Sequence, residues 1–389
     1  MEKPKLFGAR IIGYGKADVE PSWLTTNDQV SAILEKRLSE DELICKKAGI
    51  PFTDEDKIRY ASDAAWILKR VGISTRYIAP AHIATSDLAA SAATNACLHA
   101  KILIEDAESF RLATVSPDYP YSPPTVIEMM RKMGITGWIS QNVATSRLMA
   151  RDQSLACSSF GTALEDAVSD CMLGKCRYAL VVGADKMTIA GDIHDRALFP
   201  LFGDHAAALV IERVPLEESA FKPDWFFSGI DASGSERIIA TVGGSKQPLN
   251  LEYVASHPLL RETMIGMFTG NQVYEELLPI LTRHIIPNAC ENFGVLPREI
   301  AVLIPHQANG RMVDHLDKAI RKIGFQGYTS KTIVKYGNTT GATVPLGIAD
   351  EAEAGVLKEG DLILVIAMGG GYSWHLSLFR WTLPTKLAA

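Results

Sequence analysis

Long apolar stretches are missing from this chain. No uninterrupted apolar run approaches the roughly 20 residues that a membrane-spanning helix needs, and Met1–Lys5 is not followed by the apolar segment of a secretory signal peptide. Both absences argue against membrane and secreted proteins. We therefore expect a cytoplasmic protein that has no membrane as a partner.

Cysteine pairs with metal-binding spacing are also missing. The chain has six cysteines in 389 residues, and in the cytoplasm they should remain thiols. Cys171 and Cys176 form one close pair, but no second pair completes a zinc site. The sequence therefore predicts no metal.

Positive charge is the third deficit. Lys and Arg total 39 against 45 for Asp and Glu, a formal net charge of −6, whereas nucleic-acid binders carry a basic excess. The chain does have 47% hydrophobic and 22% charged residues, a composition typical of globular proteins. At 389 residues it is too long for one ordinary core, so we expect two large halves and no nucleic-acid partner.

The most informative stretch surrounds Cys157. Small, uncharged residues crowd this cysteine from Ser154 to Ala163, and apolar residues then recur at helical spacing. Cys157 is therefore predicted where a loop enters the first turn of a buried helix. Unpaired N–H groups and the positive end of the helix dipole favour an anion there, so we expect a thiol that ionises easily. Taken alone, the stretch also fits a small core cysteine.

The second half of the chain repeats the order of the first. An apolar strand ends just before His306, and Asn338 opens a small polar loop that leads into another helix and another buried strand. Singly, His306 also fits a satisfied buried histidine, and Asn338 an N-cap. We interpret the repetition as an internal duplication of residues 1–215 and 216–389, which brings the Cys157 and Asn338 junctions to a shared centre.

Five short motifs occur in a fixed order along the chain. They are Leu155-Ala156-Cys157, Phe202-Gly203-Asp204, His306-Gln307-Ala308-Asn309, Tyr336-Gly337-Asn338-Thr339-Thr340 and Gly369-Gly370-Gly371-Tyr372-Ser373-Trp374. In this order the chain resembles β-ketoacyl-acyl-carrier-protein synthase III, a condensing enzyme of the thiolase fold, over nearly its whole length.

The resemblance implies a fold, an assembly and a site. The fold is α/β and thiolase-like, a duplicated unit in five layers, αβαβα, usually as a homodimer. The site is a Cys–His–Asn set at the bottom of a pantetheine tunnel, which places the catalytic roles on Cys157, His306 and Asn338. The partners it implies are acyl thioesters of coenzyme A or of acyl carrier protein, with no other cofactor.

Those residue types suit the implied chemistry. A thiolate attacks a thioester in a nearly balanced exchange, so Cys157 can hold the acyl group while its carrier leaves. The backbone N–H groups of Cys157 and Gly370 are candidates for the oxyanion hole. A malonyl-type thioester must then lose CO2 and leave an enolate, and His306 and Asn338 can donate hydrogen bonds to its oxygen.

Binding residues follow from the same motifs. Trp66 and Arg70 resemble the pair at the tunnel mouth, where the indole stacks on the adenine of coenzyme A and arginine suits phosphates. Asn271 and Asn309 resemble contacts to the pantetheine arm, and Arg311 a contact to the carrier protein. Singly, such residues are ordinary surface side chains.

Three departures from the family pattern bear on the substrate. The loop around Cys157 is polar, with Ser158 and Ser159, where the family has alanines and a glycine. After a predicted helix over 27–37, residues 39–59 read as a charged, irregular, exposed insertion. Residues 117–124 are rich in proline and tyrosine where a dimer partner normally helps to shape the acyl pocket. These departures favour a secondary-metabolism relative, such as the ketosynthases that form dialkylresorcinols or cyclohexanediones.

Other reactions fit the same nucleophile. An acyltransferase would pass the Cys157 acyl group to an alcohol or amine, and a thioester hydrolase would pass it to water. A non-catalytic partner subunit would be expected to lack the cysteine. Only the condensing enzyme releases CO2 together with its product.

Overall fold

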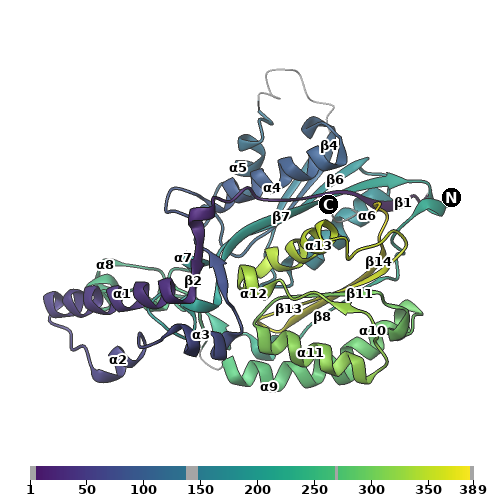
Figure 1. Ribbon diagram of the computed structural model, residues 1–389. Coiled ribbons are helices and arrows are strands. Elements are labelled where there is room, and N and C mark those ends of the chain that lie inside the picture. Colours follow the sequence, from purple (N-terminus) through teal and green to yellow (C-terminus); the bar gives the residue numbers. More distant parts are fainter. Residues whose placement is uncertain (1–5, 137–147, 268–269, 386–389) are drawn as a thin grey trace.

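Two five-stranded sheets form the framework of the computed structural model, which describes residues 6–136, 148–267 and 270–385 (Figure 1). The first sheet contains, in spatial order, β1 (Gly8–Lys16), β7 (Asp204–Val214), β6 (Tyr178–Lys186), β4 (Ala107–Ala113) and β5 (Met149–Gln153). Strands β4, β5 and β6 run parallel to one another. Strand β7 is antiparallel to β6, and β1 is antiparallel to β7.

The second sheet has the same plan. It contains, in spatial order, β12 (Tyr328–Thr329), β11 (Val302–Pro305), β13 (Leu362–Gly369), β14 (Ser373–Arg380) and β8 (Phe226–Ile230). Strands β12, β11 and β13 run parallel, and β14 and β8 follow antiparallel. The strands of the first sheet all precede residue 215 and those of the second all follow it. On this repetition we propose 1–215 and 216–389 as the two halves.

Two helices fill the space between the sheets. They are α6 (Ser159–Met172) and α13 (Thr343–Glu353), and their apolar residues share one core with both sheets. Strands β6 and β13 are buried along nearly their whole length, because helices cover both faces of each sheet. The nearly continuous apolar sequence of residues 178–183 and 362–367 predicts such buried strands, and the structure confirms both.

Helices also cover the outer face of each sheet (Figure 1). The first outer layer is α4 (Thr85–Ala100) with α5 (Thr125–Lys132), and it packs on the first sheet. The second is α9 (Gly270–Ile280), α10 (Ile286–Phe293) and α11 (Gly310–Lys322), which pack on the second sheet. The layers are thus αβαβα, as the resemblance implied.

One prediction about the N-terminal arm was wrong. Residues 39–59 are not irregular, because α1 (Asn27–Ala48) continues well past residue 37 and α2 (Asp54–Ile58) follows. A capping box at Thr26 starts α1, and Gly49 ends it in a left-handed conformation. The charged text still has a buried face, which includes Asp41 and Cys45. His194 is the polar partner of Asp41 on that face. Because the buried carboxylate is paired in this way, the helix can continue through the charged stretch.

The remaining short elements connect these layers. They are α3 (Ala64–Val71), α7 (Met187–Ala190), α8 (Leu251–Ser256), α12 (Ile333–Tyr336), β2 (Leu24–Thr26), β3 (Thr75–Tyr77), β9 (Ile238–Ile239) and β10 (Gly266–Met267). Within the described ranges, no helix combines the length and the hydropathy needed to cross a bilayer.

Candidate active site

Cys157 lies in a tight turn between β5 and α6. The backbone N–H groups of Ser158 and Ser159 donate to the carbonyls of Leu155 and Ala156, each at 3.2 Å. Ala156 has a φ of 48°, a left-handed conformation that residues other than glycine rarely adopt. Helix α6 begins at Ser159. The predicted position of Cys157, where a loop enters a helix, is therefore confirmed.

The start of helix α6 does not acidify the thiol of Cys157. Burial raises its pKa to about 12, and the negative charge of Asp185 acts in the same direction. The backbone N–H of Cys157 lowers the pKa but does not offset these effects. The expectation of an easily ionised thiol was wrong, because loss of water around the sulfur outweighs the helix N-terminus.

His306 follows β11 and is almost fully buried. The hydroxyl of Thr343 donates to the carbonyl of Thr340 at 2.9 Å, so it accepts the Nδ1–H of His306 at 2.7 Å. That assignment leaves the lone pair on Nε2, and His306 is among the residues that line the cavity. Burial lowers the pKa of His306 to about 3, so the imidazole is neutral near neutral pH.

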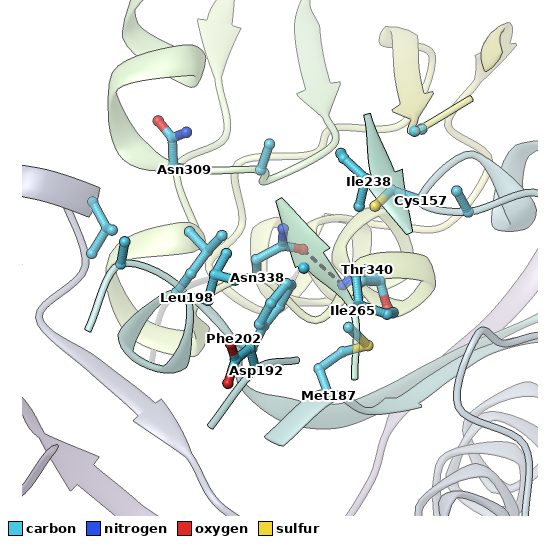
Figure 2. Close-up of a pocket in the computed structure, with 18 of the residues that line it drawn as sticks. Cys157, Met187, Asp192, Leu198, Phe202, Ile238, Ile265, Asn309, Asn338 and Thr340 are labelled. Atoms are coloured by element: carbon cyan, nitrogen blue, oxygen red, sulfur yellow. Dashed lines mark hydrogen bonds between the residues drawn. The ribbon is translucent and has the colours of Figure 1, made fainter. Parts of the chain in front are cut away.

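Asn338 lies where the two halves of the chain meet. Its backbone N–H donates to the carbonyl of Leu201 at 2.9 Å, and its carbonyl accepts from Gly203 at 3.2 Å. Its side-chain oxygen accepts the N–H of Thr340 at 2.9 Å. Figure 2 shows that the amide nitrogen of Asn338 points away from this bond. The side chain therefore offers its N–H donors to the cavity.

Asp185, which the sequence analysis missed, fixes the loop after Asn338. One carboxylate oxygen accepts hydrogen bonds from residues 114–116 of the first half, including the Val115 N–H at 2.7 Å. The other accepts from the Thr340 hydroxyl and from the Gly341 N–H of the second half, the latter at 2.9 Å. Burial raises the pKa of Asp185, and these hydrogen bonds oppose the rise. The available signal was a carboxylate at the end of an otherwise apolar strand.

A cavity of about 1330 Å³ brings the three predicted catalytic residues together. Cys157, His306 and Asn338 all line it, and Figure 2 shows Asn338 near the middle of the view and Ile238 beside the Cys157 sulfur. Much of the remaining wall is apolar and includes Met187, Leu198, Phe202, Ile265, Leu277 and Met368.

The structure places some, but not all, of the predicted binding and oxyanion residues on the cavity wall. Arg70, Asn309, Arg311 and Gly370 line the cavity. Asn309 also caps α11 by accepting the N–H of Met312 at 2.9 Å, and the Arg311 guanidinium donates to the carbonyl of Lys69 at 2.6 Å. Asn271 belongs to α9, but its side chain lies outside the described part of the structure.

Trp66 is not part of the cavity wall itself. Its indole is half-buried on α3, and the Arg196 guanidinium lies 4.7 Å from the ring centre. Such a pair is a cation–π contact. Arg196 was missed because it lies far from Trp66 in the sequence, and only the fold places them together.

Charged groups surround the outer part of the cavity. Arg59 pairs with Asp192 at 2.8 Å and with Asp195 at 3.1 Å, and Arg261 pairs with Asp56 at 3.2 Å. Among the residues with described positions, no group of three or more His, Cys, Asp or Glu side chains could hold a metal ion.

Comparison with known proteins gives consistent matches. The model of 3-oxoacyl-[acyl-carrier-protein] synthase III matches residues 151–224, and that of its C-terminal part matches residues 290–381. The β-ketoacyl-[acyl-carrier-protein] synthase III of Caldanaerobacter subterraneus subsp. tengcongensis is 32% identical over 85% of this chain and 92% of its own.

Solved structures agree with those matches. The 3-oxoacyl-[acyl-carrier-protein] synthase III of Aquifex aeolicus is 28% identical, with a TM-score of 0.72 over 96% of this chain and 100% of its own. The priming β-ketosynthase of the R1128 polyketide pathway shares the fold, with 22% identity and a TM-score of 0.77 over 99% of both chains.

Duplicated thiolase-like halves around a half-buried cysteine define a condensing acyltransferase. More narrowly, the chain belongs to the 3-oxoacyl-[acyl-carrier-protein] synthase III family.

Proposed function

We propose that the enzyme loads an acyl group from a thioester onto Cys157 and joins it to a malonyl-type thioester by decarboxylative Claisen condensation. The observation that carries the proposal is the single cavity lined by Cys157, His306 and Asn338, with the Asn338 amide nitrogen free of the bond to Thr340. No metal or other cofactor is needed for either half-reaction.

In the loading half, a neutral thiol and a neutral imidazole face the same cavity. The Cys157 proton passes to Nε2 of His306 as the sulfur attacks the thioester carbonyl. The backbone N–H groups of Cys157 and Gly370 stabilise the oxyanion. The intermediate then expels the carrier thiolate, which takes the proton back from Nε2 and leaves as a thiol.

In the condensing half, the malonyl carboxylate leaves as neutral CO2 and its electron pair forms an enolate. The half-reaction consumes one proton from solvent, which Nε2 of His306 takes up through its lone pair. With that proton, His306 and the Asn338 amide both donate to the enolate oxygen. The enolate carbon attacks the Cys157 ester, and the released sulfur takes the proton from Nε2.

The binding roles extend outward from these residues. Arg70 and Arg311 would contact the phosphates of coenzyme A or the acidic carrier protein, and Asn309 and Asn271 the pantetheine arm. Arg196 and Trp66 form a cationic and aromatic surface suited to a purine ring. The free thiols of all six cysteines support a cytoplasmic location.

The composition of the cavity wall supports an alkyl acyl group. Met187, Leu198 and Phe202 line the same cavity as Cys157 and would stabilise an alkyl chain by excluding water. A starter unit longer than acetyl agrees with a role in secondary metabolism.

Acyl loading and CO2 release test the proposal together. The enzyme is incubated with acyl-coenzyme A and acyl-carrier thioesters of increasing chain length, and mass spectrometry of the intact protein reports the adduct. Malonyl thioester is then added and CO2 is measured. We expect one adduct on Cys157, none on Cys157→Ser, and CO2 stoichiometric with a β-ketoacyl product. An adduct on Cys171 or Cys176, or free acid or an ester without CO2, would contradict the proposal.

A further inference from the structure

Three serine side chains, which we call the serine clasp, surround the turn that carries Cys157. They are Ser158 and Ser159 at the start of α6 and Ser373 at the start of β14. All three are buried. The clasp includes two of the hydroxyl groups that stand where the family pattern has small apolar residues.

Ser159 spans the left-handed residue of the turn. Its hydroxyl accepts the N–H of Leu155 at 2.7 Å and donates to the carbonyl of Ala156. These two backbone groups flank Ala156, whose φ is 48°. One side chain therefore holds both ends of the unusual backbone conformation immediately before Cys157.

Ser158 and Ser373 connect the same turn to the second half of the chain. Their hydroxyl oxygens lie 2.7 Å apart. Both also lie within hydrogen-bonding distance of the Leu155 carbonyl, Ser158 at 2.8 Å and Ser373 at 3.3 Å. The position of the turn is therefore set by β14 as well as by α6.

The loop Gly369-Gly370-Gly371, which we call the glycine loop, packs directly against the serine clasp. A Cβ atom at Gly369 would lie 2.8 Å from the Ser373 hydroxyl oxygen and 3.0 Å from the backbone nitrogen of Cys157. The clasp thus holds the Cys157 N–H against Gly369 and next to Gly370, the second candidate for the oxyanion hole. Oxyanion donors lose most of their effect when displaced by about 1 Å.

We propose that Ser158, Ser159 and Ser373 are positioning residues that fix the Cys157 N–H relative to the glycine loop and so set the rate of acyl loading. The proposal rests on the proposed function, because it assumes that Cys157 attacks a thioester. Reactions at the sulfur that form no oxyanion do not depend on the clasp in this way.

The test compares two reactions of the same sulfur. Ser159→Ala and Ser373→Ala are assayed for single-turnover acyl loading and for alkylation of Cys157 by iodoacetamide, which forms no oxyanion. We expect acyl loading to slow by about 10- to 100-fold, while alkylation changes by less than about twofold. Thr162→Ala is the matched control, because the Thr162 hydroxyl lies on the same helix and, among the described residues, bonds only the Ser159 carbonyl, at 2.9 Å.

Each outcome decides the matter. Unchanged acyl loading in both variants would overturn the clasp proposal. An equal fall in acyl loading and in alkylation would also overturn the proposal, because it would show that the serines only maintain the local structure. If Ser159→Ala does not fold, Ser373→Ala decides, because it keeps both bonds of Ser159. Failure of the wild-type enzyme to load any thioester would instead refute the proposed function.

Discussion

The neutral pair of Cys157 and His306 determines how the free enzyme responds to pH. Because burial raises the pKa of the thiol to about 12, the thiolate fraction should grow about tenfold per pH unit throughout the usual working range. Alkylation of Cys157 by iodoacetamide should therefore accelerate steadily from about pH 7 to about pH 10 without a plateau. Rates from intact-protein mass spectrometry, with Cys157→Ser as the control, check this. A plateau near pH 7 would indicate a thiolate–imidazolium pair instead.

Asn338 and His306 should differ in the half-reactions they affect. Asn338→Ala removes a donor needed only by the enolate, so CO2 release should fall by about a hundredfold or more while acyl loading changes by less than about threefold. His306→Ala should slow both half-reactions, because Nε2 handles a proton in each. Thr343→Val, which removes the acceptor of the Nδ1–H, should resemble a weaker His306→Ala. Equal losses of both half-reactions in Asn338→Ala would contradict this division.

The sequence pointed to the three residues that line the cavity together, but not to the residues that orient them. Cys157, His306 and Asn338 stand in short motifs, so each could be found from its neighbours. Asp185 and Thr343 act through hydrogen bonds to residues 340–341 and to His306. Such bonds exist only in the folded chain, and no local pattern predicts them.

At the scale of elements, the arm formed by α1 depends on one buried acidic residue. Asp41 accepts hydrogen bonds from Tyr60 at 2.6 Å and from His194 at 2.5 Å, and Arg261 donates to Tyr60 at 2.9 Å. Burial by itself would raise the pKa of Asp41, but the bonds from His194 and Tyr60 lower it below its usual range. This network connects α1 to the segments near the cavity mouth.

Asp41→Ala should therefore destabilise the protein and disturb the cavity. Removing the carboxylate leaves the donors of His194 and Tyr60 buried without their acceptor, which typically costs about 1–3 kcal/mol of unfolding free energy. The lowered pKa predicts that this contribution is present near neutral pH and is lost as the pH falls below about 4. Urea unfolding measures both effects. Glu40→Ala, which removes only an exposed pair with Lys36, is the control and should change stability by less than about 1 kcal/mol.

The same arm shows where element prediction failed. The strand that ends before His306 and the strand that follows the helix after Asn338 are apolar throughout, so their sequences predict buried strands. The second part of α1 is rich in Lys, Glu and Asp and resembles a solvated loop. Its buried partner His194 comes from a distant segment, so the sequence near Asp41 does not show that the helix is covered.

At the scale of the whole molecule, the loop over residues 117–124 bears on assembly. Tyr121 is 80% exposed and Tyr119 is 47% exposed, and the Tyr121 hydroxyl donates to the Gly243 carbonyl at 3.4 Å. Large aromatic side chains exposed in this way suit a protein interface. We expect an obligate homodimer in which this loop reaches the acyl pocket of the partner.

Two measurements test that assembly. Sedimentation at low micromolar protein should show a dimer, since obligate interfaces usually bury more than about 2,000 Å², and an active monomer would contradict it. Tyr121→Ala should change the preferred acyl-chain length, with Tyr328→Ala, an exposed tyrosine on β12, as the control. An unchanged chain-length profile would mean that the loop only covers its own subunit.

The bonds of Asp185 also have a consequence for the order of events during synthesis. The nascent chain presents Cys157 and Asp185 long before Thr340, Gly341 and Ser373 are translated, since domains form from the N-terminal side onward. Until then one oxygen of the Asp185 carboxylate lacks its donors, and the Cys157 turn lacks its contact to β14. We therefore expect a ribosome-bound chain to be unreactive toward thioesters. On the proposed function, Cys157 would become reactive only after the last strands of the second sheet have been synthesised and folded.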